Sequence, residues 1–350
     1  MSTDRAPMLR GTALAVLAAL AFGASAPVVA SAGRGVGPLA TASTLYVGAA
    51  LAAAALGVVS GRAGRPLLMR DAARLSAVAV LGACVAPSLL AWGLQRSGAA
   101  VGSLLLNFEA AFTALFAWAL HREPLGRRAL GALVLMTAAG AALARDGASA
   151  PLASSAGVIA VVGATAAWSL DNALSRGLAD VDPLRVVAAK GSLGAALTAS
   201  AAVALGERAP SSGPLLVLLA CGATGYGLSL RLYLLAQREM GAARTASVFA
   251  VGPFVGAALA WGAGGAAPGP LVLLAAVALA VGVALHATEA HGHPHVHAPI
   301  EHDHPHEHGD LHHDHLHQPP FAGVHSHPHA HPLVEHDHPH APDLHHEHRH

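Results

Sequence analysis

Two stretches of this 350-residue chain decide its fold: "QRSGAAVGSLLLNFEAAF", Gln95–Phe112, and "REMGAARTASVFAVGPFV", Arg238–Val255. Each stretch follows an apolar segment, makes a short polar turn and continues through Gly-Ala-Ala into another apolar segment. The two turns lie 143 residues apart. The chain therefore contains two copies of one pattern.

The composition is that of a membrane protein. The chain is 54% hydrophobic and only 11% charged, and its mean hydropathy is +0.51, which is too apolar for an ordinary soluble domain. The formal net charge is zero, so no basic surface suggests nucleic acid. We find no nucleotide-binding loop and no catalytic Ser-His-Asp or Cys-His arrangement, and therefore do not expect an enzyme. Cys84 and Cys221 lie within apolar runs and are interpreted as small core residues.

The apolar runs divide into ten candidate spans. A hydrocarbon layer about 30 Å thick requires about 20 helical residues. Cutting the sequence at charges, Gly and Pro predicts helices over 11–30, 38–59, 75–95, 98–120, 127–145, 156–175, 184–205, 213–236, 242–262 and 269–288. The first run also resembles a signal peptide, but its length and the many spans after it favour a retained helix.

The positions of the basic residues support this number of spans. With a cytoplasmic N-terminus, fourteen of the 20 basic residues fall on the cytoplasmic side and four on the other, while Lys190 and Arg231 lie within spans. Cytoplasmic loops of membrane proteins carry such an excess of Lys and Arg. We expect an integral protein of the cell membrane with both termini in the cytoplasm.

Five spans per copy is an odd number, so the second copy crosses the membrane in the opposite sense. Inverted repeats are typical of transporters, which bind substrate near the middle of the bilayer. The predicted fold is an all-α membrane protein of ten transmembrane helices in two inverted five-helix repeats, residues 11–145 and 156–288. A short cytoplasmic N-terminus, 1–10, precedes them, and a disordered cytoplasmic tail, 289–350, follows.

Residues 11 to 288 resemble the drug/metabolite transporter superfamily in its ten-helix EamA-type form. The resemblance is carried by "LAALAFGASAPVVA" and "GATAAWSLDNALSRGLA" and by the stretches beginning at Ser97 and Tyr233. The family pattern reads Leu-Glu-Pro. The first copy keeps Glu109 but has Ala110 in place of Pro, while the second keeps Pro253 but has Gly252 in place of Glu. The resemblance implies secondary transport of small organic molecules, often coupled to protons and commonly export.

Glu109 is the first candidate for the transport chemistry. It lies about eleven residues into its predicted span, near the middle of the bilayer, where a carboxylate is costly unless it is paired or protonated. It is therefore a candidate proton carrier or cation ligand; the alternative is a protonated side chain that only hydrogen-bonds to a neighbouring helix. Asn107 is a candidate cavity-lining residue, but it does not share a helix face with Glu109.

A second candidate group consists of Asp171, Lys190 and Arg231, each about five residues from the cytoplasmic end of its span. Lys190 is the only lysine in the chain. Two interpretations are open: a salt-bridged gate with Asp171, or two long cations that extend to the inner interface. Trp168 and Asn172 flank Asp171 and either line the cavity or pack. From their positions in the spans, Glu109 and Asp171 are expected at different depths.

The C-terminal tail is dominated by histidine. Residues 286–350 hold 24 of the 25 histidines, with ten acidic residues and many prolines between them. Such a composition predicts disorder, and neutral imidazole is a good ligand for Zn, Ni, Co and Cu. The candidate metal ligands are His291, His293, His295, His297, His302, His304, His306, His308, His312, His313, His315 and His317. The alternative is a polar, pH-sensitive tail.

Three functions remain. The first is a secondary transporter of a small organic solute, in which the tail binds metal and no cofactor is required. The second is an exporter of divalent transition metals, in which the tail collects ions; the near absence of histidine from the spans argues against it. The third, metal storage, would need only one anchoring helix. We expect a monomer or homodimer, with a small-molecule substrate and the lipid bilayer as partners.

Overall fold

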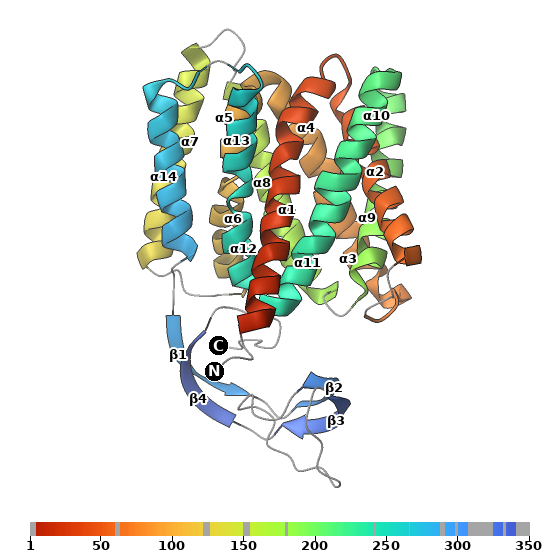
Figure 1. The fold of residues 1–350 in the computed structure, drawn as a ribbon, viewed down its shortest axis with the longest axis vertical. Helices are drawn as coiled ribbons and strands as arrows, with labels where there is room; N and C mark the ends of the chain where they lie inside the picture. Colours follow the sequence, from red (N-terminus) through yellow and green to blue (C-terminus); the bar gives the residue numbers. More distant parts are fainter. Residues whose placement is uncertain are drawn as a thin grey trace. The chain divides into compact units, whose positions relative to one another are not determined.

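The computed structural model describes residues 5–59, 64–121, 127–149, 155–178, 181–240, 242–265, 267–287, 291–297, 300–306, 325–331 and 334–340. They form two units, Met1–Glu289 and Ala290–His350. The first unit is a bundle of helices (Figure 1).

Ten rods cross the bundle, as predicted; each rod is a single helix or a run of consecutive helical segments. The rods of the first repeat are α1 (Arg5–Ala32), α2 (Pro38–Val59), the run α3 (Ala72–Ala79), η2 (Val80–Val85) and α4 (Ala86–Ser97), the pair α5 (Ala99–Leu105) and α6 (Phe108–His121), and α7 (Arg127–Ser149). Those of the second are α8 (Ser155–Ser175), α9 (Pro183–Ala204), the run α10 (Ser212–Cys221), η4 (Gly222–Leu228) and α11 (Ser229–Met240), the pair α12 (Ala242–Phe249) and α13 (Gly252–Gly262), and α14 (Pro270–Ala287). Two short 3₁₀ turns, η1 (Met69–Asp71) and η3 (Arg176–Leu178), lie between rods.

Apolar length explains why these segments form rods. Seven of them are long and apolar enough to cross a membrane, and three shorter apolar helices complete the set. In lipid, only a helix satisfies all its backbone hydrogen bonds within one segment. The predicted ten-helix fold in two repeats is therefore confirmed.

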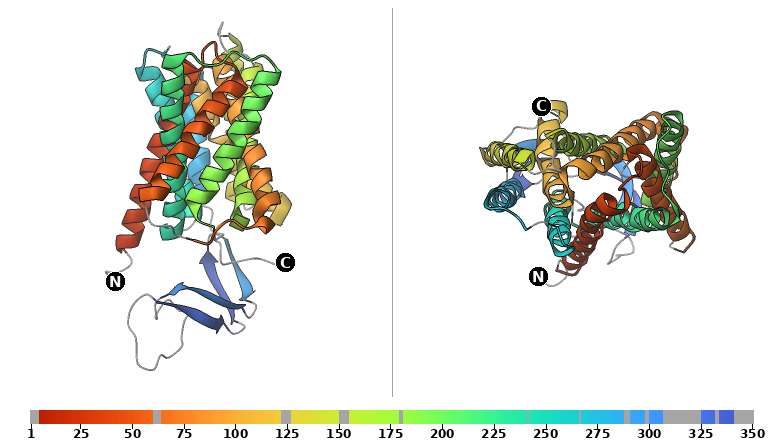
Figure 2. Two further views of the ribbon diagram at one scale, coloured as in Figure 1. Left: turned by 90° about the vertical axis from the view of Figure 1, so that its right-hand side faces the viewer. Right: turned by 90° about the horizontal axis from the view of Figure 1, so that it is seen from above.

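Packing follows the repeat. The second helices of the two repeats, α2 and α9, pack together, and so do the fifth helices, α7 and α14, which form one edge of the bundle (Figures 1 and 2). The third rod of each repeat packs against the first rod of the other, α4 against α8 and α11 against α1. The contact of a third rod with a first rod thus occurs twice, once for each repeat.

The fourth rod of each repeat is broken at the same point. In the first repeat, α5 ends at Leu105 and α6 begins at Phe108; in the second, α12 ends at Phe249 and α13 begins at Gly252. The sequence predicted two continuous helices here. Discontinuous helices at matching positions of two repeats are where transporters of this kind bind substrate and ions.

The third rod of each repeat contains a π-helical segment, η2 at Val80–Val85 and η4 at Gly222–Leu228. Such segments are rare and occur frequently at functional sites. Gly82 and Gly225 lie 143 residues apart at equivalent places within them. The repeat therefore reproduces local distortions as well as helices.

The tail differs from the prediction of disorder in its described parts. It forms β1 (His291–His297), β2 (Ile300–His306), β3 (His325–His331) and β4 (Val334–His340), with β1 antiparallel to β4 and β2 to β3. Histidine at every second position has the period of a strand. The composition that predicted disorder did not take this alternation into account.

Candidate functional site

The break in the fourth rod places Glu109 at the start of a helix. The turn at Leu106–Asn107 ends α5, and Glu109 lies in the first turn of α6, where its own N–H donates to the Leu106 carbonyl oxygen at 3.1 Å. The side chain of Glu109 is half-buried. The break thus leaves a carboxylate at an internal helix terminus.

Glu109 is bound by the other repeat. Asn172 Nδ2, on α8, donates a hydrogen bond to Glu109 Oε1 at 2.8 Å. Ser169 Oγ, one turn earlier on α8, donates to the Glu109 carbonyl oxygen at 3.0 Å. The structure therefore joins Glu109 and Asn172, two candidates from different repeats, in one contact.

Asn107 makes its side-chain hydrogen bond within its own rod. It is 3% exposed, and its amide donates to the Leu104 carbonyl oxygen at 3.0 Å. Its Oδ1 atom is buried without a hydrogen-bond partner, and so is the Ser103 hydroxyl one turn before it. Such atoms are rare in folded proteins and need an explanation.

Asp171 and Lys190 form a buried ion pair between α8 and α9, in which Lys190 Nζ donates to Asp171 Oδ2. Asp171 is 2% exposed and Lys190 6%. Of the two open interpretations, the geometry is that of a pair and not of a lysine extended to an interface. Burial of both charges is tolerated only because each neutralises the other.

The ion pair packs against the π-helical segment of the first repeat. A side chain at Gly82 would overlap the Asp171 carboxylate, so glycine is required here for close approach. The Gly82 carbonyl oxygen accepts hydrogen bonds from the Tyr46 hydroxyl and, at 3.0 Å, from Trp168 Nε1. Trp168 is therefore a packed residue with its ring nitrogen satisfied.

The expected difference in depth between Glu109 and Asp171 does not separate them. Asn172, which holds Glu109, is the residue next to Asp171 on α8. The predicted depths assumed an uninterrupted helix from residue 98, whereas α5 ends at Leu105 and a new helix, α6, begins at Phe108. The two acids therefore belong to one polar region.

Aromatic side chains from both repeats surround this region. Phe22 of α1 lies against Trp168, Tyr226 and Phe249, with ring centroids 5.8, 6.0 and 5.4 Å apart. Tyr46 lies 5.6 Å from Tyr226. These are favourable spacings for aromatic pairs. Of these aromatic residues, only Trp168 was predicted from the sequence; the scarcity of aromatics, 4% of the chain, was the available signal for the others.

Arg231 and seven of the predicted metal ligands lie on other elements of the structure. Arg231 is half-buried on α11, a helix that packs mainly against α1. Among the residues whose side chains the structure describes, no group of three or more His, Cys, Asp or Glu could hold a metal ion. His291, His293, His295, His297, His302, His304 and His306 lie on β1 and β2. His308, His312, His313, His315 and His317 lie outside the described residues.

Comparison with known proteins agrees with this architecture. The model of the EamA-like transporter family matches twice, over residues 9–144 and 155–288. A crystal structure of a protein superposes with a TM-score of 0.57 at 18% identity, over 81% of this chain and 96% of that one, which shows a shared fold. No curated protein matches the chain. The two family matches coincide with the two repeats and confirm the predicted resemblance, and the chain belongs to the EamA-like transporter family.

Proposed function

We propose that this membrane transporter of small solutes is a secondary transporter of an organic solute, working as an exporter coupled to protons through Glu109. The observation that carries the proposal is the contact of Glu109, at the break between α5 and α6, with Asn172 of the other repeat. A carboxylate that can hold a proton or a cationic group, but not both, couples the two fluxes by competition.

The surroundings of the break support a polar ligand beside Glu109. Ser103 Oγ and Asn107 Oδ1 are buried without hydrogen-bond partners in the same rod. A solute that carries hydrogen-bonding groups would satisfy such atoms. The neighbouring aromatic rings offer an apolar surface to the rest of such a molecule.

The test is solute uptake by proteoliposomes. A panel of metabolites and a panel of Ni, Co, Zn and Cu ions are compared under an imposed proton gradient, with empty liposomes as the control. The proposal expects gradient-dependent uptake of an organic solute. Uptake confined to the metal panel would replace it with the alternative of a divalent-metal exporter.

The tail is the observation that favours a role for metal, and the proposal assigns it the binding of several Zn, Ni, Co or Cu ions. Residues 291–306 and 325–340 are two copies of one sequence, identical at eleven of sixteen positions. In the register of β1 and β4, His291, His293 and His295 lie opposite His340, His338 and His336. In β2 and β3, His302, His304 and His306 lie opposite His329, His327 and His325.

This arrangement suits metal binding because alternate positions of a strand share one face and directly opposed residues lie about 5 Å apart at Cβ. The duplicated sequence predicts two equivalent sets of ions. Equilibrium dialysis with Ni²⁺ should find more than one ion per chain at neutral pH and none after removal of residues 290–350. The ions should leave below about pH 6, since only neutral imidazole is a ligand.

We further propose that the protein lies in the cell membrane with both termini in the cytoplasm, on the basis of its basic residues. Reporter fusions after Arg70, Arg128, Arg185 and Glu289 should report the cytoplasm, and fusions after Arg34, Arg145 and Arg208 the opposite side. An extracytoplasmic C-terminus would contradict this topology.

A further inference from the structure

At each end of the bundle, a loop of one repeat is hydrogen-bonded to a loop of the other. At the end where α1 begins, the Asp182 N–H donates to the Arg65 carbonyl oxygen at 3.1 Å. At the far end, the Gly37 N–H donates to the Arg208 carbonyl oxygen at 3.0 Å. One contact joins the α8–α9 loop to the α2–α3 loop, and the other joins the α1–α2 loop to the α9–α10 loop.

These two contacts are copies of each other. Asp182 precedes Pro183, the first residue of α9, and Gly37 precedes Pro38, the first residue of α2. The acceptors, Arg65 and Arg208, lie 143 residues apart, the spacing of the repeat. Because the second repeat is inverted, the same contact appears at opposite ends of the bundle.

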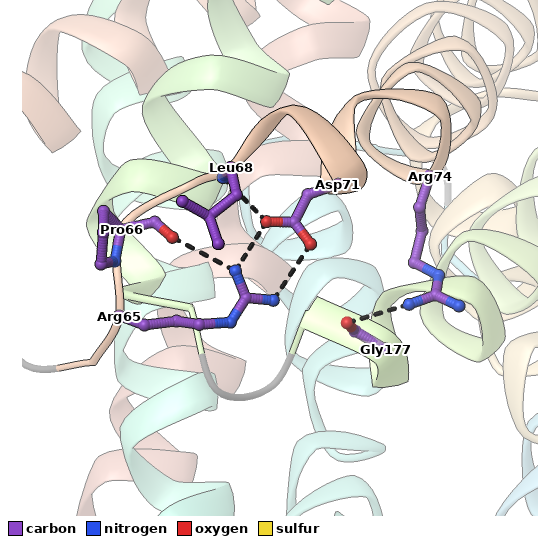
Figure 3. A network of polar contacts seen from close by, with 6 residues as sticks. All are labelled: Arg65, Pro66, Leu68, Asp71, Arg74 and Gly177. Atoms are coloured by element: carbon purple, nitrogen blue, oxygen red, sulfur yellow. Dashed lines mark hydrogen bonds and ion pairs between the residues drawn. The ribbon is translucent and has the colours of Figure 1, made fainter.

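At the α1 end, an ion pair within the α2–α3 loop fixes Arg65, whose carbonyl oxygen accepts the contact from the other repeat. Arg65 donates from both terminal nitrogens to Asp71, at 2.6 and 3.0 Å, and the Leu68 N–H donates to Asp71 Oδ2 at 2.9 Å (Figure 3). Arg74 Nη1 crosses to the other repeat and donates to the Gly177 carbonyl oxygen at 3.0 Å (Figure 3).

An apolar cluster lies beside these polar contacts. Its buried members are Val78, Leu178, Val181 and Val186, and Leu67, Leu75 and Leu174 pack against them. The cluster draws on both repeats, so separation of the loops would expose it to water. Exposure of apolar side chains to water is unfavourable, so the cluster favours the closed arrangement of the loops.

The far end is held by a single carboxylate. Glu207 Oε2 accepts a hydrogen bond from the Ala40 N–H in the first turn of α2, at 3.0 Å. The associated apolar cluster contains only Val36, Ala40 and Ala202, with Leu39 against it. Two hydrogen bonds between the repeats are described at each end, so the difference lies in the apolar clusters, and the far end has less apolar surface to expose on opening.

We infer that these two contacts are the gates of the transport path. Glu207, which crosses between the repeats, holds the far gate shut, and the Arg65–Asp71 pair, which fixes the α2–α3 loop, holds the other in place. The inference rests on the proposed transport function. Repeats that rock against each other must break their contacts at one end at a time. Both contacts are formed here, so the structure corresponds to a state closed at both ends, in which the far gate is the weaker.

The test measures access to the site and needs no substrate. Cys84→Ser and Cys221→Ser remove the native thiols, and Asn172→Cys, an exposed position on α8, introduces a reporter. A membrane-impermeant maleimide is then applied to sealed vesicles of both orientations. Glu207→Ala should raise labelling several-fold from one side of the membrane, and Asp71→Ala should raise it from the opposite side.

Matched controls remove exposed arginines near each gate. Arg34→Ala at the far end and Arg70→Ala beside Asp71 should leave labelling at the reporter unchanged from either side. If Asp71→Ala fails to fold, Arg74→Ala breaks a contact between the repeats at the same end and should raise labelling from the same side.

Equal labelling from both sides in the Glu207 and Asp71 variants, or labelling equal to that of the parent, would overturn the inference. If transport assays found no substrate at all, that result would contradict the proposed function. It would leave the labelling result standing, since the labelling does not depend on a solute. The two failures are therefore distinguishable. A larger increase for Glu207→Ala than for Asp71→Ala would support the weaker far gate.

Discussion

The two repeats share their geometry but not their chemistry. Both have a fourth rod broken at the same point and a third rod with a π-helical segment. At the break, the first repeat carries Glu109 and the second carries Gly252. Across from the π-helical segments, Gly82 faces the charged Asp171 and Lys190, whereas Gly225 faces the neutral Ser25.

The difference has a steric cause at the break. A side chain at Gly252 would lie 2.9 Å from the Ala19 carbonyl oxygen of α1, so the second repeat has no room for the family's glutamate. The duplicated fold has two breaks and two equivalent glycines, Gly82 and Gly225. Only one break and only one of these glycines lie beside charged groups. The charged groups therefore lie where the two repeats depart from symmetry.

The largest expected effect comes from leaving one charge of the buried pair alone. Lys190→Met should destabilise the protein by about 3 kcal/mol, because Asp171 stays buried without its partner. The measurement is thermal unfolding in detergent. A double variant, Asp171→Asn with Lys190→Met, should recover most of the loss; equal losses in both variants would mean that the charges do not interact.

Alanine substitutions at the equivalent glycines, Gly82 and Gly225, allow a direct comparison of the two repeats. Gly82→Ala should cost about 2 kcal/mol, because the methyl group overlaps the Asp171 carboxylate. In Gly225→Ala the nearest atom is Ser25 Cβ at 2.8 Å, and the cost should be smaller because no charge is displaced. The reverse order of unfolding temperatures would show that the ion pair does not depend on Gly82.

The smallest effect concerns the hydrogen bond that joins the repeats at the break. Ser169→Ala removes the donor to the Glu109 carbonyl oxygen and should cost about 1 kcal/mol. Thr137→Ala, which removes an exposed hydroxyl bonded within α7, is the control. If both variants lose the same free energy of unfolding, the hydrogen bond between the repeats stabilises the protein no more than the exposed one does.

The sequence was sufficient to predict the number of rods because apolar length and Arg position are local signals. Gln95–Phe112 and Arg238–Val255 also revealed the repeat. The break at Leu106–Asn107 was missed because no Pro or Gly stands at that point, and the polar Asn107 and Glu109 were interpreted as residues of one continuous helix.

The candidate site was predicted only in part. A rare charge in an apolar run identified Glu109, Asp171 and Lys190, because such residues are costly in a membrane. The residues in contact with these charges could not be predicted from the sequence. Gly82 is one of 38 glycines, and its role depends on packing between repeats. The contact of Glu109 with Asn172 also depends on tertiary structure, since 63 residues separate them.

The measurement that tests the account most directly is proton-driven flux of an identified solute by the Glu109→Gln variant in proteoliposomes. Gln keeps the shape and can still accept the hydrogen bond from Asn172, but it cannot release a proton. We expect normal folding, with gradient-driven flux reduced at least about ten-fold, while the control variant Glu239→Gln, near the end of α11, transports normally. Wild-type flux in Glu109→Gln, at matched protein levels, would remove Glu109 from the mechanism and contradict the account.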